Sequence, residues 1–236
     1  MVIKVYISVT SHLPFDCVLK CVETEFEAIA ADITKPDRKD LANFACWHDK
    51  SYARSYFVGL FDSLGEIMRQ EEDSESQELS DSESQEELSR RNYSWSKDIM
   101  MSLINTILRF VHTSTKIAIF PLTTFTVMKY HEKDTGIICH EVPQVLIQAF
   151  LAFQKNPALD IRRTFALRME GTKLQLSAAS ISRAYIDTLS QGKYLSDGFT
   201  LLSSKAYDLR EPEERREAVR LLIGLLRYLD ATQSNS

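Results

Sequence analysis

Alternating apolar and polar residues open the chain. Apolar side chains occupy every second position of residues 3–9, the period that a half-buried strand shows. Apolar side chains three or four positions apart then predict one helix over residues 14–32 and a second over 35–70. We therefore interpret residues 1–70 as an N-terminal unit of one strand and two helices.

The second half of the chain alternates helical and strand-like patterns. Residues 94–111 and 144–154 carry helical apolar spacing, and residues 208–230 open with Pro212 and glutamates, as the first turn of a helix often does. The intervening strand-like segments predict two hairpins, over residues 116–142 and over 164–177 with a turn at 170–172. This order predicts an α/β (α+β) domain over residues 93–231, with a mixed sheet flanked by helices; residues 1–70 either form a separate unit or belong to this same domain.

The polar pattern changes sharply between the two halves. Residues 71–89 carry nine acidic side chains and no basic one, so they bury too little apolar surface to offset the cost of ordering their backbone. We predict a disordered acidic linker at residues 71–92. Ser80 and Ser84 each have an acidic residue three positions later and are candidate phosphorylation sites; the alternative is an unmodified, extended spacer.

Composition narrows the class of protein. The net charge is −5, but without the nine linker acids 28 basic residues face 24 acidic ones, so the remainder is mildly basic at +4. That charge leaves nucleic acid open as a partner without predicting it. No apolar run is long enough to span a bilayer, so we expect no membrane partner. The chain has four cysteines and no signal-peptide pattern, which argues against an oxidised, secreted protein. We therefore expect an intracellular protein, cytoplasmic or nuclear.

Two strings in the second half carry a resemblance to a known family. GIICHEVPQVLIQAFLAFQ and RRTFALRMEGTKLQLS, in their helix and hairpin order, resemble the PD-(D/E)XK nuclease-like superfamily, as found in fungal proteins with or without a fused fungal-type kinase domain. The resemblance covers about residues 94–230 and implies a restriction-endonuclease-like fold. It matches Glu141 to the glutamate of the second hairpin strand, Gln144 or Gln148 to a helix glutamine, and Gly171 to a turn glycine.

The chain departs from that family where cleavage chemistry requires acids and a cation. Residues 122–125, where the family has an aspartate, contain no acid, and Pro143 stands where a lysine is expected. We therefore predict no confident catalytic residue, no metal and no cofactor. A relocated Mg²⁺ site using Asp134, Glu141 and Lys129 is the alternative, and a solvated carboxylate at the end of a strand is the simpler interpretation of Glu141.

Other candidate sites depend on side chains of mixed chemistry. A C-x3-C…C-x-H set at Cys17, Cys21, Cys46 and His48 has zinc-ligand residue types, but its cysteines fall in apolar stripes, where a thiol is a small hydrophobe. Arg162, Arg163 and Gln148 are candidate contacts to nucleic acid or a protein partner. Arg215 and Arg216 form either a phosphate-contacting patch or the solvated face of the last helix.

Three functions follow from these patterns. The first is a non-catalytic intracellular binding or regulatory protein, a pseudoenzyme on a degenerate nuclease-like fold, with a protein partner. The second is a metal-dependent nuclease, a defence or genome-conflict factor, with a rearranged site. The third is a protein–protein adaptor that acts through the N-terminal helices.

Overall fold

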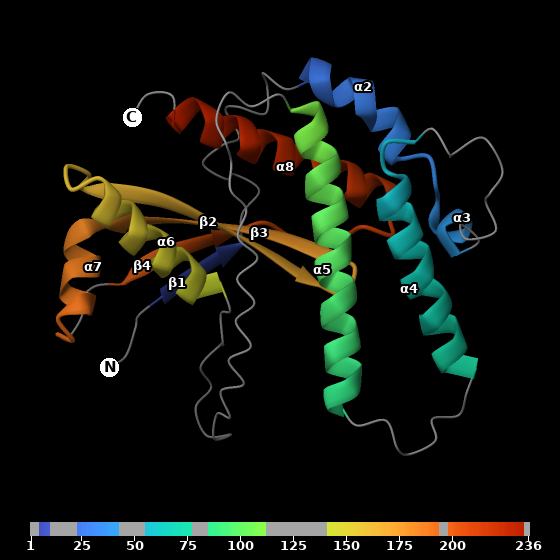
Figure 1. The fold of residues 1–236 in the computed structure, drawn as a ribbon, viewed down its shortest axis with the longest axis horizontal. Coiled ribbons are helices and arrows are strands. Elements are labelled where there is room, and N and C mark those ends of the chain that lie inside the picture. The colour runs from blue at the N-terminus through green and yellow to red at the C-terminus, as the bar shows by residue number, and fades with distance from the viewer. Residues whose placement is uncertain are drawn as a thin grey trace. The chain divides into compact units, whose positions relative to one another are not determined.

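The computed structural model describes residues 5–9, 23–42, 55–76, 85–111, 141–193 and 198–233 (Figure 1). Within these residues the fold is mixed α/β, as predicted, and the chain forms two compact units. The first unit contains β1 (Val5–Val9), α6 (Glu141–Lys155), most of β2 (Ile161–Glu170) and β3 (Lys173–Ser182), α7 (Arg183–Ser190) and β4 (Phe199–Ser203). The second contains α2 (Glu23–Ile33), α3 (Arg38–Ala42), α4 (Val58–Ser76), α5 (Gln85–Phe110), the β2–β3 turn, β5 (Tyr207–Asp208) and α8 (Pro212–Gln233).

The sheet of the first unit has the strand order β1-β4-β3-β2. β1 runs parallel to β4, with Val5 opposite Phe199 and Val9 opposite Ser203, whereas β3 runs antiparallel to β4. The predicted mixed sheet is therefore confirmed. The first strand thus pairs with a strand near the other end of the chain, so residues from both sides of the acidic tract contribute to one sheet.

The hairpin of β2 and β3 was predicted correctly, including its turn. Gly171 adopts a φ of +57°, a left-handed conformation that a side chain disfavours, and it connects Glu170 to the start of β3. The burial of β3 alternates at its start, as the sequence pattern predicts for a strand with one covered face. In the second unit β5 pairs with this end of β3.

α6 and α7 cover one face of these strands (Figure 1). The core between them consists of Val145, Leu146, Ala149 and Phe153 from α6, Tyr185 and Ile186 from α7, and Ala166, Ala179, Ile181, Phe199 and Leu201 from the strands. The Ser182 side chain caps α7 by accepting a hydrogen bond from the Tyr185 backbone N–H at 3.2 Å. α7 is not among the elements predicted from the sequence.

A buried arginine organises the second unit. Arg215 on α8 is fully buried; its guanidinium donates to the carbonyl oxygens of Ile33 at 2.7 Å, Leu209 at 2.7 Å and Pro36 at 2.5 Å. It also lies 5.4 Å from the centre of the Phe61 ring. Burial lowers the pKa of Arg215 to about 10, which leaves the guanidinium charged at neutral pH. Arg215 therefore connects α8 to the end of α2, and neither predicted role, phosphate contact or solvated face, describes it.

Helical structure reaches further into the acidic tract than the sequence predicted. α4 continues to Ser76 and α5 begins at Gln85, so both ends of the predicted disordered linker at residues 71–92 are helical. Glutamate, glutamine and serine near an amphipathic helix extend it at little cost in propensity, which an argument from low hydrophobicity alone overlooks. The predicted helix over 35–70 is represented by α3 and α4, with residues 43–54 outside the described ranges.

None of the helices among the described residues is both long enough and apolar enough to cross a lipid bilayer.

Substituting Arg215 tests its role in the second unit. We expect Arg215→Met to lower the free energy of unfolding by about 3 kcal/mol or more, because three buried carbonyls lose their donor. Arg216→Met is the matched control, since Arg216 forms partly exposed ion pairs with Glu27 and Glu213 and lies 5.5 Å from the centre of the Phe26 ring, and its loss is expected to cost less than about 1 kcal/mol. Urea unfolding followed by tryptophan fluorescence measures both; equal losses would contradict the role of Arg215.

Candidate functional site

α6 carries two of the site residues predicted from the sequence, Glu141 and Gln148. Glu141 is its first residue and Gln148 lies two turns later. Pro143 fits the first turn because its missing N–H has no partner within a helix there, and Glu141 and Lys155 place charges of favourable sign at the two ends. The strand predicted to end at residue 142 is therefore replaced by helix at residues 141–142.

Glu141 is buried, which corrects the interpretation of a solvated carboxylate at the end of a strand. Its residue surface is 3% exposed, and its Oε1 atom lies 3.7 Å from Nη1 of Arg168 on β2. The Arg168 side chain is 37% exposed, whereas the Glu141 side chain is 4% exposed. A buried carboxylate requires such a cation, since an unpaired charge in this position is costly.

The ion pair determines what Glu141 can do chemically. A Mg²⁺ ligand must present a carboxylate oxygen to a cation that also keeps several waters, in a site open to substrate. Here an arginine already compensates the charge, and the carboxylate is enclosed. Within the described residues, no group of three or more His, Cys, Asp or Glu side chains is placed to hold a metal ion.

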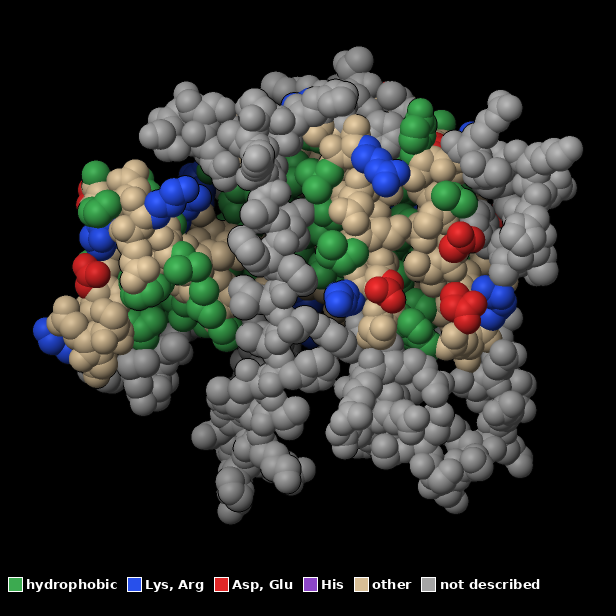
Figure 2. Space-filling view, viewed as in Figure 1, with side chains coloured by type: hydrophobic (Ala, Val, Ile, Leu, Met, Phe, Trp, Pro, Cys, Tyr) green, Lys and Arg blue, Asp and Glu red, His purple; other side chains and the backbone are tan. Residues whose placement is uncertain are grey.

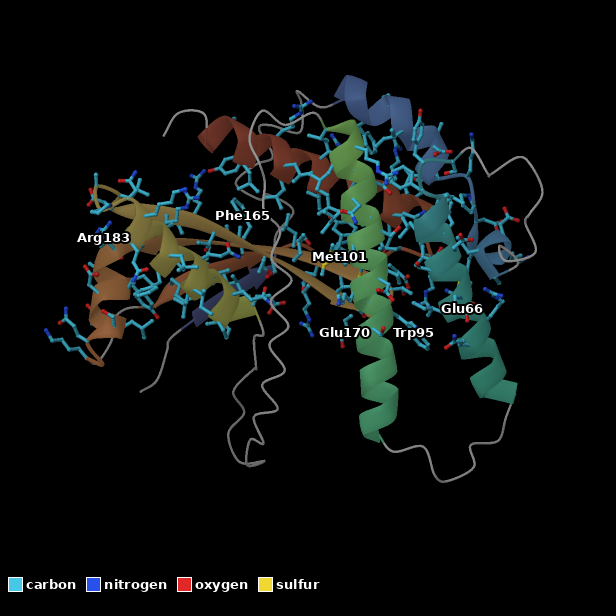
Figure 3. The ribbon with its side chains drawn as sticks, viewed as in Figure 1. Glu66, Trp95, Met101, Phe165, Glu170 and Arg183 are labelled. Carbon is cyan, nitrogen blue, oxygen red and sulfur yellow. The ribbon has the colours of Figure 1, made fainter. Side chains whose placement is uncertain are left out.

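Gln148 binds the backbone of β2 with both ends of its amide. Its Nε2 atom donates to the carbonyl oxygen of Phe165 at 2.7 Å, and its Oε1 atom accepts from the Phe165 N–H at 3.2 Å. Figure 3 labels Phe165 on this strand. The side chain thus pairs with β2 as the backbone of a neighbouring strand would. This structural role differs from the partner contact predicted for Gln148.

Arg162 and Arg163 do not form one contact patch. They are consecutive on β2, where neighbouring side chains point to opposite faces, and Arg162 is half-buried whereas Arg163 is exposed. The two residues are adjacent in the sequence, but on a strand adjacent side chains point to opposite faces of the sheet.

The remaining predicted site residues lie outside the described ranges. These are the catalytic candidates Asp134 and Lys129, the phosphorylation candidates Ser80 and Ser84, and the possible zinc ligands Cys17, Cys21, Cys46 and His48. The first predicted hairpin, over residues 116–142, also lies outside the described residues, except for residues 141–142.

Arg183 holds the other end of α6 and was not singled out from the sequence. Its Nε atom donates to the carbonyl oxygen of Leu159 at 2.9 Å, and its Nη2 atom to those of Asn156 at 3.0 Å and Phe153 at 3.3 Å (Figure 3). The guanidinium also lies 4.8 Å from the centre of the Phe153 ring. A cation at the carbonyl end of a helix is favourable, but the sequence offers no signal for a cap supplied from 28 residues beyond the helix.

The outer side of α6 is apolar. Ile147, Phe150 and Leu151, spaced three and four apart, are 41%, 39% and 57% exposed, and we call these three residues the α6 stripe. Figure 2 shows hydrophobic side chains gathered over this helix. A surface helix normally turns polar residues outward, so the α6 stripe is the feature of this unit that most resembles a contact surface.

The Gln148 contact predicts a change in local stability. We expect Gln148→Ala to destabilise the α6–β2 contact by about 1 kcal/mol, and Gln148→Glu to cost more, because a carboxylate has no donor for the Phe165 carbonyl. Gln154→Ala, an exposed glutamine on the same helix, is the control and is expected to be near neutral. Hydrogen exchange at the Phe165 amide measures the effect; unchanged protection in Gln148→Ala would contradict it.

The Glu141–Arg168 pair predicts coupled stabilities. Arg168→Met leaves a buried carboxylate without this cation and is expected to cost about 1–3 kcal/mol, more than Glu141→Gln, whose amide is neutral. The double variant is expected to recover about 1 kcal/mol of the summed loss. Amide exchange across α6 and β2 at pH 7 measures all three variants, and purely additive losses would show that Arg168 does not compensate Glu141.

Comparisons of the chain with protein-family models, with curated proteins and with solved structures give no match.

Proposed function

We propose that this chain is a non-catalytic intracellular binding or regulatory protein, built on a degenerate nuclease-like fold. The observation that carries the proposal is the Glu141–Arg168 pair: the one predicted catalytic candidate among the described residues is buried at the start of a helix and compensated by an arginine. An enzyme of the resembled family presents that glutamate on a strand beside a lysine. Here Glu141 begins a helix, and the neighbouring cation is an arginine on another element, Arg168 on β2.

The order of elements supports the nuclease-like ancestry. α5 precedes and α6 follows the region of the first predicted hairpin, α6 carries Gln144 and Gln148, and the β2–β3 hairpin turns at Gly171. The mixed sheet is compatible with the same ancestry. The family's glutamine position is used here to bind the β2 backbone, which is a role in packing rather than in chemistry.

The α6 stripe supplies the binding surface in this proposal. Its three apolar side chains lie on a helix that is charged only at its ends, so a protein partner with an apolar patch or groove would gain by covering them. The partner class follows from the side chains: an aliphatic and aromatic stripe offers nothing to the phosphates of a nucleic acid, which require cations.

Two measurements on the full chain test the proposal. Plasmid DNA and RNA incubated with the protein in Mg²⁺ or Mn²⁺ are expected to stay intact; cleavage that Glu141→Ala abolishes would establish the nuclease alternative instead. A photo-crosslinking residue at position 151, introduced in the native cells, is expected to give a discrete protein adduct that Ile147→Glu removes. The same residue at position 154 is the matched control, and equal adducts from both positions would contradict the α6 stripe as the contact surface.

A further inference from the structure

Among the described residues β2 is the last strand of its sheet, since the strand order is β1-β4-β3-β2. An outermost strand presents backbone N–H and C=O groups that a further strand can bind. In an antiparallel pair, alternate residues direct these groups toward the neighbouring strand, and the residues between them direct theirs away from it. Every second residue of β2 therefore contributes to its outer edge.

The Gln148 contact shows which residues form that edge. Its amide binds both the N–H and the carbonyl oxygen of Phe165, so these two backbone groups point away from β3, the hairpin partner of β2. By alternation, Arg163 and Leu167 direct their backbone groups to the same outer side, and Ala166 directs its groups to β3. Phe165 thus occupies the middle of the outer edge.

α6 lies over a face of the sheet, and the Gln148 side chain extends from it to the edge. Val145, Ala149 and Phe153 belong to the core between α6 and the strands. Gln148 lies outside that core and is exposed, so its contact with the β2 backbone is at the surface. Ile161, at the start of β2, is 62% exposed. Solvent therefore reaches both the beginning of this edge and the side chain that binds its middle.

Two hydrogen bonds in the middle of an edge interrupt the continuous row that an added strand requires. We propose that Gln148 closes the β2 edge, and that without its side chain a second copy of the chain pairs with β2, antiparallel about a two-fold axis at Phe165. Natural sheets protect their edges by comparable means. A second copy is the occupant that fits, because two-fold pairing places identical backbone groups opposite one another.

The charges of β2 allow this pairing. With Phe165 opposite its counterpart, Arg162 of one copy lies opposite Arg168 of the other. Arg168 already forms an ion pair with Glu141, so Arg162 faces a compensated charge. The like-charge repulsion that would oppose the pairing is reduced accordingly.

Gln148→Ala in the full chain removes the closing side chain. We expect its self-association, followed by sedimentation velocity at increasing concentration, to be at least about tenfold stronger than that of the original chain, because each copy gains a backbone hydrogen bond at Phe165. Gln154→Ala, at an exposed glutamine of the same helix, is the matched control and is expected to behave as the original chain. In Gln148→Ala the amides of Arg163 and Leu167 are expected to exchange more slowly with rising concentration, whereas the amide of Ala166 stays unchanged.

Gln148→Glu separates an open edge from a loss of stability. It is expected to destabilise the contact with β2 more than Gln148→Ala does, but its carboxylate keeps the bond from the Phe165 N–H and places like charges near the two-fold axis. We therefore expect it to self-associate no more than the original chain. Ile147→Glu added to Gln148→Ala is expected to leave self-association unchanged, so this test and that of the proposed function fail separately.

Three results would each overturn the closed edge. The first is self-association of Gln148→Ala at the level of Gln154→Ala. The second is self-association of Gln148→Glu as strong as that of Gln148→Ala, which would show that lost stability drives it. The third is association that Ile147→Glu removes, or that leaves exchange at Arg163 and Leu167 independent of concentration, because the contact would then lie elsewhere than on β2.

Discussion

The attachment of α6 to β2 and to the start of α7 determines what the first unit can present to its surroundings. Arg168 compensates Glu141 at the first turn, Gln148 binds the Phe165 backbone in the middle, and Arg183 closes the carbonyl end. With polar contacts at three levels, the helix cannot rotate without leaving a buried carboxylate or backbone groups unpaired. The same attachment that encloses Glu141 therefore keeps the α6 stripe outward.

In each of the two units, one arginine donates hydrogen bonds to several backbone carbonyl oxygens. In the second unit Arg215 donates to the carbonyls of Ile33, Pro36 and Leu209, and in the first Arg183 donates to carbonyls at the end of α6. A rigid guanidinium with several donors suits convergent carbonyls that a helix end leaves open. The sequence offered Arg215 as a phosphate contact or as part of a solvated face, and it did not single out Arg183, whereas both side chains satisfy the protein's own backbone.

The sequence predicted those parts of the fold that depend on local periodicity. It located α6, the β2–β3 hairpin with its glycine turn, and α8, because apolar spacing and turn residues act within a few positions. It left open whether the two halves share a sheet, and it did not predict that Arg168 would compensate Glu141, because both contacts join residues distant in the chain. The burial of Glu141 was missed because a charged residue in a sequence gives no sign of its partner.

We propose that the Glu141 carboxylate is committed to Arg168 and does not bind a divalent ion. Selective broadening of backbone amide signals by Mn²⁺ tests it most directly, because a paramagnetic ion affects nuclei close to its site. The account predicts that the amides of the first turn of α6 and of Arg168 keep their line widths at Mn²⁺ concentrations that saturate a specific site. Selective broadening at Glu141 that disappears in Glu141→Gln would contradict it.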